Sequence, residues 1–112
     1  YKRQAVFSAN TAHIMGIDAV EAMFGVAGEV LRQSGLFCLY GPFREGGEFD
    51  TESNRDFDES LRMRDQSMGI RDLEALDRFA GSSGMTHLRR YAMPANNQMH
   101  IWQKTPKLSE GG

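Results

Sequence analysis

The sequence predicts an α/β domain whose mixed sheet has four strands, two parallel and two forming a C-terminal antiparallel hairpin, together with about three helices. Three observations predict this class. A strand, helix and strand pattern fills the first part of the chain, and an unbroken apolar run at residues 36–42 ends that pattern. Two segments rich in β-forming residues, 85–93 and 97–104, follow later. The turn between them is short enough to force an antiparallel hairpin.

The first helix is predicted to begin at Asp18, a favourable N-cap residue with Glu21 three positions later, as in a capping box. Apolar residues then recur at spacings of three and four, and Gly35 supplies the stop. A strand at 4–10 precedes this helix and the apolar run follows it, so the two strands should be parallel. The run at 36–42 is apolar on both alternating faces, which predicts a central strand covered on both sides.

The second half is predicted to contain two more helices before the hairpin. A polar stretch with two glycines, 43–51, is expected to be a loop. Ser53 then opens a helix that turns Phe57 inward and is interrupted by Gly69. A third helix is expected at 70–82.

The hairpin carries most of the remaining aromatic and imidazole groups. Trp102 and Tyr91 are expected to form a cross-strand aromatic pair. His87 and His100 are predicted to be isolated from each other. With one cysteine in the chain and no paired histidine spacing, the sequence gives no support for a metal site.

Charge, apolar stretches and cysteine content indicate which binding partners and which cellular compartment to expect. A formal net charge of −2 gives no electrostatic reason to expect nucleic acid or an anionic membrane surface. No stretch approaches the roughly 20 apolar residues of a transmembrane helix. Cys38 lies inside the apolar run and has no second cysteine to pair with, so a reducing cytoplasm is the expected compartment.

Five motifs follow one another along the chain. They are Asn10-Thr11-Ala12-His13-Ile14, Leu39-Tyr40-Gly41-Pro42-Phe43, Ser53-Asn54 with Phe57-Asp58 and Ser60-Leu61-Arg62, Gly69-Ile70-Arg71-Asp72, and Met93-Pro94-Ala95-Asn96-Asn97. In this order they resemble the C-terminal half of a small, little-characterised bacterial family of S-adenosylmethionine-dependent methyltransferase-like proteins, and the resemblance covers nearly the whole chain. It implies a partial Rossmann-like, class I methyltransferase fold in which the strands lie in the order first, second, fourth, third. One domain is expected at 1–104, followed by a flexible tail at 105–112.

The resemblance also implies S-adenosylmethionine as the cofactor of the complete family fold. In such folds a glycine-rich turn after the first strand holds the nucleotide, and this sequence shows no such turn. We therefore expect a truncated methyltransferase-like domain that binds no cofactor and is not catalytic on its own. The alternative is a non-catalytic module, for small-molecule binding or assembly, that has kept the scaffold.

Two residues are candidates for catalysis. Asn10 and His13 follow the first strand, where the resemblance places the reacting centre. A neutral imidazole there can accept a proton from a substrate heteroatom. The alternative is that both residues only cap the start of the helix.

Candidates for binding a small-molecule substrate come from three further places. Tyr40 and Phe43 close the central strand, and Asn96 and Asn97 precede the last strand; a turn with core aromatics and a hairpin explain them equally well. Arg71 belongs to a charged group that can hold a carboxylate or phosphate, or can simply form an ion-paired surface.

The first strand is expected to lie at a bare sheet edge. It contains Val6 and Phe7 and no proline or lysine that would discourage pairing. The sequence therefore predicts a homodimer, formed through this edge or through uncovered sheet faces.

Overall fold

The computed structural model describes residues 2–49 and 51–105. Of the tail expected at 105–112, only Thr105 lies among these described residues.

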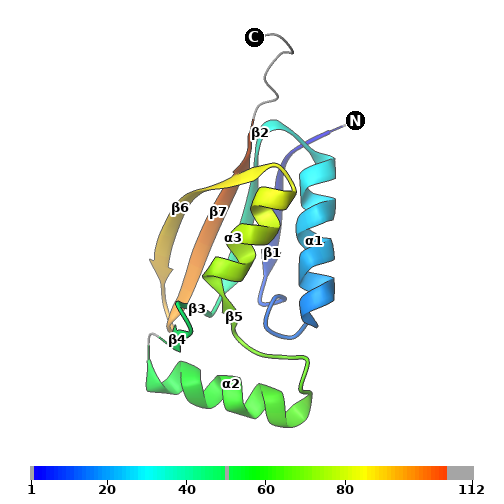
Figure 1. The fold of residues 1–112 in the computed structure, drawn as a ribbon. Helices are drawn as coiled ribbons and strands as arrows, with labels where there is room; N and C mark the ends of the chain where they lie inside the picture. The colour runs from blue at the N-terminus through cyan, green and yellow to red at the C-terminus, as the bar shows by residue number, and fades with distance from the viewer. Residues whose placement is uncertain (1, 50, 106–112) are drawn as a thin grey trace.

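The main sheet has four strands in the order β1-β2-β7-β6, which confirms the predicted fold class (Figure 1). β1 and β2 are parallel, whereas β2 with β7 and β6 with β7 are antiparallel. The strands are β1 (Arg3–Ala9), β2 (Leu31–Gly41), β6 (Met85–Met93) and β7 (Asn97–Lys104).

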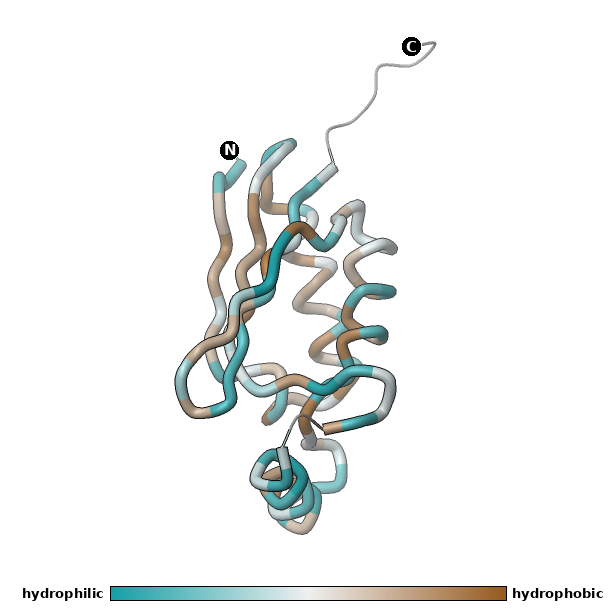
Figure 2. The backbone as a smooth tube through the Cα atoms, turned by 90° about the vertical axis from the view of Figure 1, so that its left-hand side faces the viewer, coloured by the Kyte–Doolittle hydropathy of each residue, from teal (hydrophilic) through white to brown (hydrophobic). Residues whose placement is uncertain are grey.

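Three helices surround the sheet unevenly. α1 (Ile17–Val30) and α3 (Leu73–Ser82) lie on the same face, while α2 (Glu52–Arg64) lies across the end at which β1 and β2 finish (Figure 1). Turned by 90°, the molecule shows both α1 and α3 on one side of the strands and no helix on the other (Figure 2). The apolar run in β2 is therefore covered by helices on one face only, in contrast to the predicted cover on both.

The covered face forms the core. Phe37 of β2 and Trp102 of β7 are neighbours in register, and both are fully buried. Phe24 of α1 meets each of these rings edge-on, with 5.0 Å between centroids. Trp102 pairs across the hairpin with His87, whereas Tyr91 pairs with Met99, so the predicted Trp102–Tyr91 pair is wrong. A one-residue irregularity between His87 and Arg89 shifts the register and changes which residues meet.

The opposite, helix-free face is also largely apolar. Cys38 and Ile101 are neighbours in register, and Phe7 lies beside Cys38 on β1. In the next row Tyr40 is the neighbour of Met99. These side chains alternate with the core residues along each strand, so they point to the side without helices.

The first helix differs from the prediction at both ends. It starts at Ile17 with Gly16 as the N-cap residue and has no side-chain cap, so Asp18 lies in the first turn instead of capping. It ends at Val30, and β2 begins directly at Leu31. Gly35 lies inside β2, where a bulge shifts the pairing with β1. A Cβ on Gly35 would lie 2.9 Å from the Arg32 carbonyl oxygen, so close packing of the backbone requires this glycine.

The segment predicted to be a loop at 43–51 contains two short strands. β3 (Phe43–Glu45) pairs with β4 (Glu48–Phe49) across Gly46 and Gly47, which both have positive φ. β3 also pairs in parallel with β5 (Arg71–Asp72), which gives a small second sheet. Such two-residue strands carry too little periodicity to be visible in a sequence.

The second and third helices are shorter than predicted. Thr51, not Ser53, caps α2 by accepting a hydrogen bond from the Asn54 backbone N–H at 3.1 Å. α2 ends at Arg64, ahead of the predicted stop, and Phe57 is 41% exposed instead of turned inward. The residues that α2 buries are Asn54, Asp58 and Leu61.

α3 begins at Leu73 because the Asp72 carboxylate caps it, accepting from the Glu74 backbone N–H at 2.9 Å. The predicted start at residue 70 is displaced because β5 occupies Arg71 and Asp72.

Candidate functional site

A tight turn after β1 places His13 at the carboxyl end of the parallel strands. Asn10 ends the strand in a left-handed conformation (φ 56°), and its backbone N–H donates to the Tyr40 carbonyl at 2.8 Å. The Thr11 carbonyl then accepts from the N–H groups of Ile14 and Met15, both at 3.1 Å. The chain thus reverses within a few residues, with His13 on the turn.

His13 is nearly buried and has an unusual set of neighbours. Its side chain and backbone together are 7% exposed, and its ring meets the edge of Phe57 at 5.5 Å between centroids. Burial, and then the positive charge of Arg71, hold the pKa of the imidazole below its ordinary value of 6.5. Among the described residues, none hydrogen-bonds a ring nitrogen of His13. The site therefore presents a neutral imidazole with a nitrogen available to a ligand.

Arg71 acts on the backbone around His13. Its Nε donates to the Ala12 carbonyl at 3.0 Å, and its guanidinium also donates to the carbonyls of Met15 and Ser67, each at 2.5 Å. A further bond runs from the Gly69 N–H to the His13 carbonyl at 2.9 Å. One cation thus joins the turn after β1 to the segment before β5, and the structure places it behind the histidine.

A hollow of about 390 Å³ opens in front of His13, and we name it the histidine hollow. It gathers three of the residues singled out in the sequence: Asn10 and His13 from the turn after β1, and Asn97 from the start of β7. Its lining is Asn10, His13, Pro42, Ser53, Asn54, Phe57, Ala95 and Asn97.

Backbone conformations with positive φ concentrate around this hollow. In the described part of the chain, four residues other than glycine have positive φ, and two of them, Asn10 and Ala95, line the hollow. Asn96, with φ 62°, follows Ala95 in the same turn. An alanine in this region is disfavoured by about 1 kcal/mol, and such outliers gather at functional sites.

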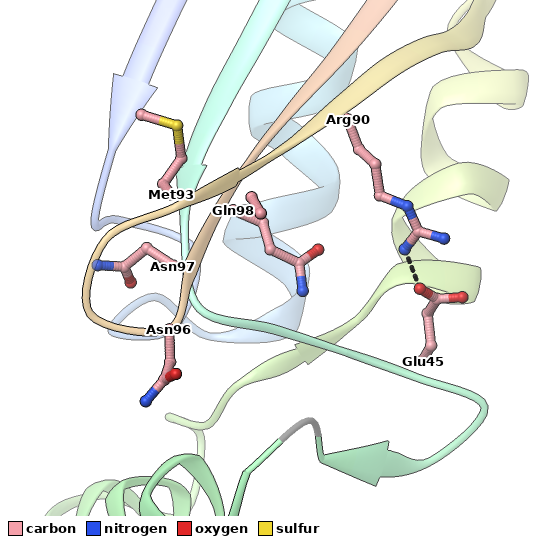
Figure 3. Close-up of a pocket in the computed structure, with 7 residues that line it drawn as sticks. Glu45, Arg90, Met93, Asn96, Asn97 and Gln98 are labelled. Atoms are coloured by element: carbon pink, nitrogen blue, oxygen red, sulfur yellow. Dashed lines mark hydrogen bonds and ion pairs between the residues drawn. The ribbon is translucent and has the colours of Figure 1, made fainter.

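A second hollow, of about 360 Å³, lies beside the β6–β7 turn and is named the hairpin hollow (Figure 3). An ion pair between Arg90 and Glu45 lies at its margin. Asn97 lines both hollows, and its side-chain amide donates to the Tyr40 hydroxyl at 3.3 Å. Asn96 lines the hairpin hollow, and its carbonyl accepts from the Asn54 side-chain amide at 3.3 Å.

The predicted site residues therefore separate into three groups. The histidine hollow contains Asn10, His13 and Asn97, with Tyr40 bonded to the last of these. Asn96 lines the neighbouring hairpin hollow. Arg71 lies behind the histidine hollow, where its guanidinium is hydrogen-bonded to backbone carbonyls. Phe43 is 1% exposed and packs edge-on against His100 at 4.7 Å, within the core.

Asn54 was not singled out from the sequence as a site residue. It is 6% exposed, on the first turn of α2, and bonds the hairpin turn. The sequence predicted Ser53 as the start of this helix, whereas Thr51 caps it and accepts from the Asn54 backbone N–H, so the cap spacing did not single out Asn54.

The two histidines of the hairpin are bonded to each other, so the prediction that they are isolated is wrong. Their nitrogens, His87 Nε2 and His100 Nδ1, are 2.9 Å apart, and His100 Nε2 donates to the Gln98 Oε1 at 2.7 Å. Burial lowers the pKa of His100 to about 4, so His100 is neutral near pH 7 and its Nδ1 accepts from His87. The His87–Trp102 register places the two imidazoles on neighbouring strands on the core side.

The glycines do not form a cofactor loop among the described residues. Gly25 and Gly28 lie inside α1, and a Cβ on Gly28 would come within 2.5 Å of the Ser83 carbonyl oxygen. Gly28 is thus explained by the close approach of α1 to the end of α3. Gly81 lies inside α3 and Gly84 follows that helix. A nucleotide needs a glycine-rich turn between a strand and a helix, so the residues present do not fit S-adenosylmethionine.

Residues 2–49 and 51–105 contain neither a metal-binding cluster nor a membrane-crossing helix. No group of three or more histidine, cysteine or acidic side chains there is arranged to hold a metal ion. None of the helices α1 to α3 combines the length and the apolar character needed to cross a membrane.

Comparison with known families gives one match that spans the described chain. Residues 2–104 match the family model described as a protein of unknown function, DUF938. The chain belongs to the DUF938 family. The family description carries no activity, so the fold comparisons add the remaining information on this DUF938 chain.

The solved structures similar to the DUF938 chain include methyltransferases. An O-methyltransferase family 2 protein from Planctomyces limnophilus DSM 3776, in complex with apigenin, matches with a TM-score of 0.83 at 10% identity. An O-methyltransferase family protein from Burkholderia thailandensis matches at 0.78 and 10% identity. CalO1, a methyltransferase in calicheamicin biosynthesis solved with SAH bound, matches at 0.75 and 11% identity.

The overlap is one-sided. The matches cover 94%, 94% and 96% of the DUF938 chain but 31% of each of the three structures. The DUF938 chain therefore has the fold of about a third of a methyltransferase chain, in agreement with the partial methyltransferase fold that the resemblance implied.

Proposed function

We propose that this chain supplies the acceptor side of an S-adenosylmethionine-dependent methyltransferase-like domain, and that a different part of a longer chain or a partner holds the cofactor. The observation that carries the proposal is the nearly buried imidazole of His13, with no bonding partner among the described residues, facing the histidine hollow. The fold shared with methyltransferases supports it.

His13 is the proposed proton acceptor. Methylation of a hydroxyl or amine removes one proton from the heteroatom that gains the methyl group. Because its pKa is lowered, His13 is in the basic form at neutral pH and can take that proton on its open ring nitrogen.

Asn10 and Asn97 are the proposed orienting residues. Both line the histidine hollow, and an amide offers a donor and an acceptor to a polar group of the substrate. The Asn97 amide is held by the Tyr40 hydroxyl and by the Pro94 carbonyl, each at 3.3 Å. Arg71 is a positioning residue, because it holds the backbone on both sides of His13.

The methyl group would come from S-adenosylmethionine bound outside these residues. Titration calorimetry of this chain with S-adenosylmethionine should therefore show no binding. A dissociation constant in the micromolar range would overturn the assignment of the cofactor to another part.

The acceptor side is tested by an NMR titration with apigenin, a hydroxyl-bearing compound and the ligand of the Planctomyces structure. We expect shifts at Asn10, His13 and Asn97, and about tenfold weaker binding in His13→Gln, since the flexible amide does not reproduce the position of the imidazole nitrogen that bonds the ligand. His87→Gln is the matched control, since it makes the same change outside the hollow. Equal losses in both variants would contradict the proposal.

The second candidate function is a non-catalytic binding module, and the absence of a fitting cofactor turn among the described residues favours it. It predicts that apigenin binds the histidine hollow but is not methylated when a cofactor-binding protein part is supplied. Methyl transfer that His13→Gln lowers about a hundredfold supports the acceptor role instead.

A further inference from the structure

The hairpin hollow carries one cationic and one anionic side chain at its margin. These are Arg90 and Glu45, which form an ion pair with each other. The other described residues that line the hollow are neutral: Ala92, Met93, Asn96, Asn97 and Gln98. A volume of about 360 Å³ is sufficient for a small ligand, and sites for small molecules combine a few convergent polar groups with apolar walls.

Two neighbouring strands direct polar groups into this hollow. Arg90 and Ala92 of β6 are the register partners of His100 and Gln98 of β7, so these side chains share one face of the sheet. Figure 3 shows Gln98 and Arg90 extending to the same side of the hairpin. His100 Nε2 donates to the Gln98 Oε1 at 2.7 Å, so the donor end of the amide is directed away from the histidine. A guanidinium and an amide donor next to each other are suited to a carboxylate.

The ion pair at the margin can be exchanged at low cost. The side chains of Arg90 and Glu45 are 49% and 53% exposed. An ion pair this exposed contributes only about 0–1 kcal/mol to stability. A ligand carboxylate can therefore take the place of the Glu45 carboxylate, which returns to water. The planar guanidinium then binds the ligand with two parallel hydrogen bonds.

The charge of the hollow favours a carboxylate over a phosphate. Glu45 shows that a carboxylate fits against Arg90. Among the described lining residues Arg90 is the one cation, and Glu45 adds a negative charge beside it. A phosphate group carries nearly two negative charges at neutral pH, so part of its charge would stay unmatched close to Glu45.

The hairpin hollow is a neighbour of the histidine hollow. Asn97 lines both of them, and the β6–β7 turn contributes residues to each. The turn is tied to α2, because the Asn54 side-chain amide donates to the Asn96 carbonyl at 3.3 Å. One ligand that extends past Asn97 can thus place one polar group at His13 and a second polar group at Arg90.

We propose that the hairpin hollow is a carboxylate subsite, in which Arg90 and the Gln98 amide bind an acid group of the methyl acceptor in place of Glu45. The acceptor is then a small molecule that carries both a hydroxyl group and a carboxylate. That the ligand is the methyl acceptor rests on the proposed function. The recognition of a carboxylate rests on the hairpin hollow itself.

The test is an NMR titration of the isotope-labelled chain with three related compounds. They are para-hydroxyphenylacetate, phenylacetate, which lacks the hydroxyl group, and para-hydroxyphenylacetamide, which lacks the charge. We expect shifts at Arg90 and Gln98 with both carboxylates and not with the amide, and shifts at His13 with both hydroxyl compounds. Binding of the carboxylates should weaken as salt is raised.

Two substitutions should change the affinity in opposite directions. Arg90→Gln should weaken the binding of para-hydroxyphenylacetate about tenfold and leave that of the amide unchanged, because a charge-assisted hydrogen bond is lost. Glu45→Gln should tighten carboxylate binding up to about fivefold, because the competing carboxylate is removed. Arg89→Gln is the matched control, since Arg89 is an exposed arginine of β6 outside the lining of the hollow.

Four results would overturn the carboxylate subsite. They are an absence of shifts at Arg90 and Gln98 up to millimolar ligand, equal binding of the acid and the amide, equal losses in Arg90→Gln and Arg89→Gln, or no tightening in Glu45→Gln.

The subsite and the proposed function can fail separately. Phenylacetate has no hydroxyl group, so His13→Gln should leave its affinity unchanged, and it tests the subsite by itself. If para-hydroxyphenylacetate binds no more tightly than phenylacetate, the subsite does not serve an acceptor at His13, and that part of the proposal is wrong.

Discussion

The two faces of the sheet carry similar side chains in different surroundings. On one face Phe37 and Trp102 are fully buried under α1 and α3. On the other, Cys38 and Ile101 occupy the neighbouring positions of the same strands without a helix above them (Figure 2). The alternation of side chains along a strand predicts which residues share a face of the sheet. It does not predict which of the two faces the helices cover, because that depends on the rest of the chain. The helix-covered face should therefore provide most of the folding stability of the domain, and the helix-free face should be the surface through which the domain associates with other chains.

The difference between the two faces is tested most directly by truncating one side chain on each face and comparing the losses in free energy of unfolding. Trp102→Ala should cost about 3–5 kcal/mol, because it leaves a cavity against Phe24 and leaves the Asp77 carboxylate without the indole donor at 2.9 Å. Ile101→Ala should cost about 1 kcal/mol. Urea denaturation followed by circular dichroism measures both. Equal losses would show that the helix-free face is part of the core.

The pH dependence of stability should also come from the covered face. The pKa of His100 is lowered from 6.5 to about 4 in the folded chain, so as the pH falls the unfolded chain takes up the proton first. The contribution of His100 to the free energy of unfolding is therefore complete above about pH 6.5. As the pH falls toward 4, the free energy of unfolding decreases by about 3 kcal/mol. The lowered pKa of His13 acts in the same direction.

His100→Phe is the control for that pH effect, since phenylalanine has a similar size and does not titrate. Unfolding free energies measured between pH 7 and pH 4 should fall less steeply in this variant. An unchanged slope would mean that other groups cause the loss.

Two glycines of α1, one packed against the end of α3 and one facing open space, allow a smaller effect on stability to be tested. Gly28→Ala should destabilise by about 1–3 kcal/mol, because the new Cβ would meet the Ser83 carbonyl oxygen at 2.5 Å. Gly25→Ala has nothing within 4 Å and should stabilise the helix by about 0.5–1 kcal/mol. Melting temperatures that move the same way in both variants would contradict the close approach of α1 and α3.

The smallest effect on stability is expected at Phe7 on the open edge. Phe7→Thr should change the free energy of unfolding by no more than about 0.5 kcal/mol, because the side chain is 61% exposed. The sequence predicts that the chain forms a homodimer through this edge or through uncovered sheet faces, and the variant should weaken that association. Analytical ultracentrifugation decides: a wild-type chain that is monomeric at micromolar concentration would make the homodimer prediction wrong.

Elements with strong hydrophobic periodicity were predicted correctly from the sequence. The strand and helix pattern of the first half and the closing hairpin were both predicted, and the strand order, which came from the resemblance, is confirmed. Helix limits were predicted less well. Asp18 satisfied the capping rule, yet the observed cap of α1 is Gly16, two residues earlier, where the turn around His13 leads into the helix.

The candidate site was predictable in part, for a topological reason. Asn10 and His13 follow β1, and Asn97 begins β7, which lies on the far side of β2, so the sheet order alone brings these segments toward the same end. The position of α2 was not predictable, because its buried residues include Asn54 and Asp58, which are polar. Asp58 accepts from the Ile70 N–H at 2.8 Å, a contact that no spacing rule anticipates.

The sulfur atom of Cys38 lies among the apolar side chains of the helix-free face, on the strand next to the open edge. Burial raises the pKa of this thiol, so little of it is ionised at neutral pH and alkylating reagents should react with it slowly. Any protein that settles over this face would slow the reaction further. The single cysteine thus gives the molecule an intrinsic reporter of whether its exposed side is occupied.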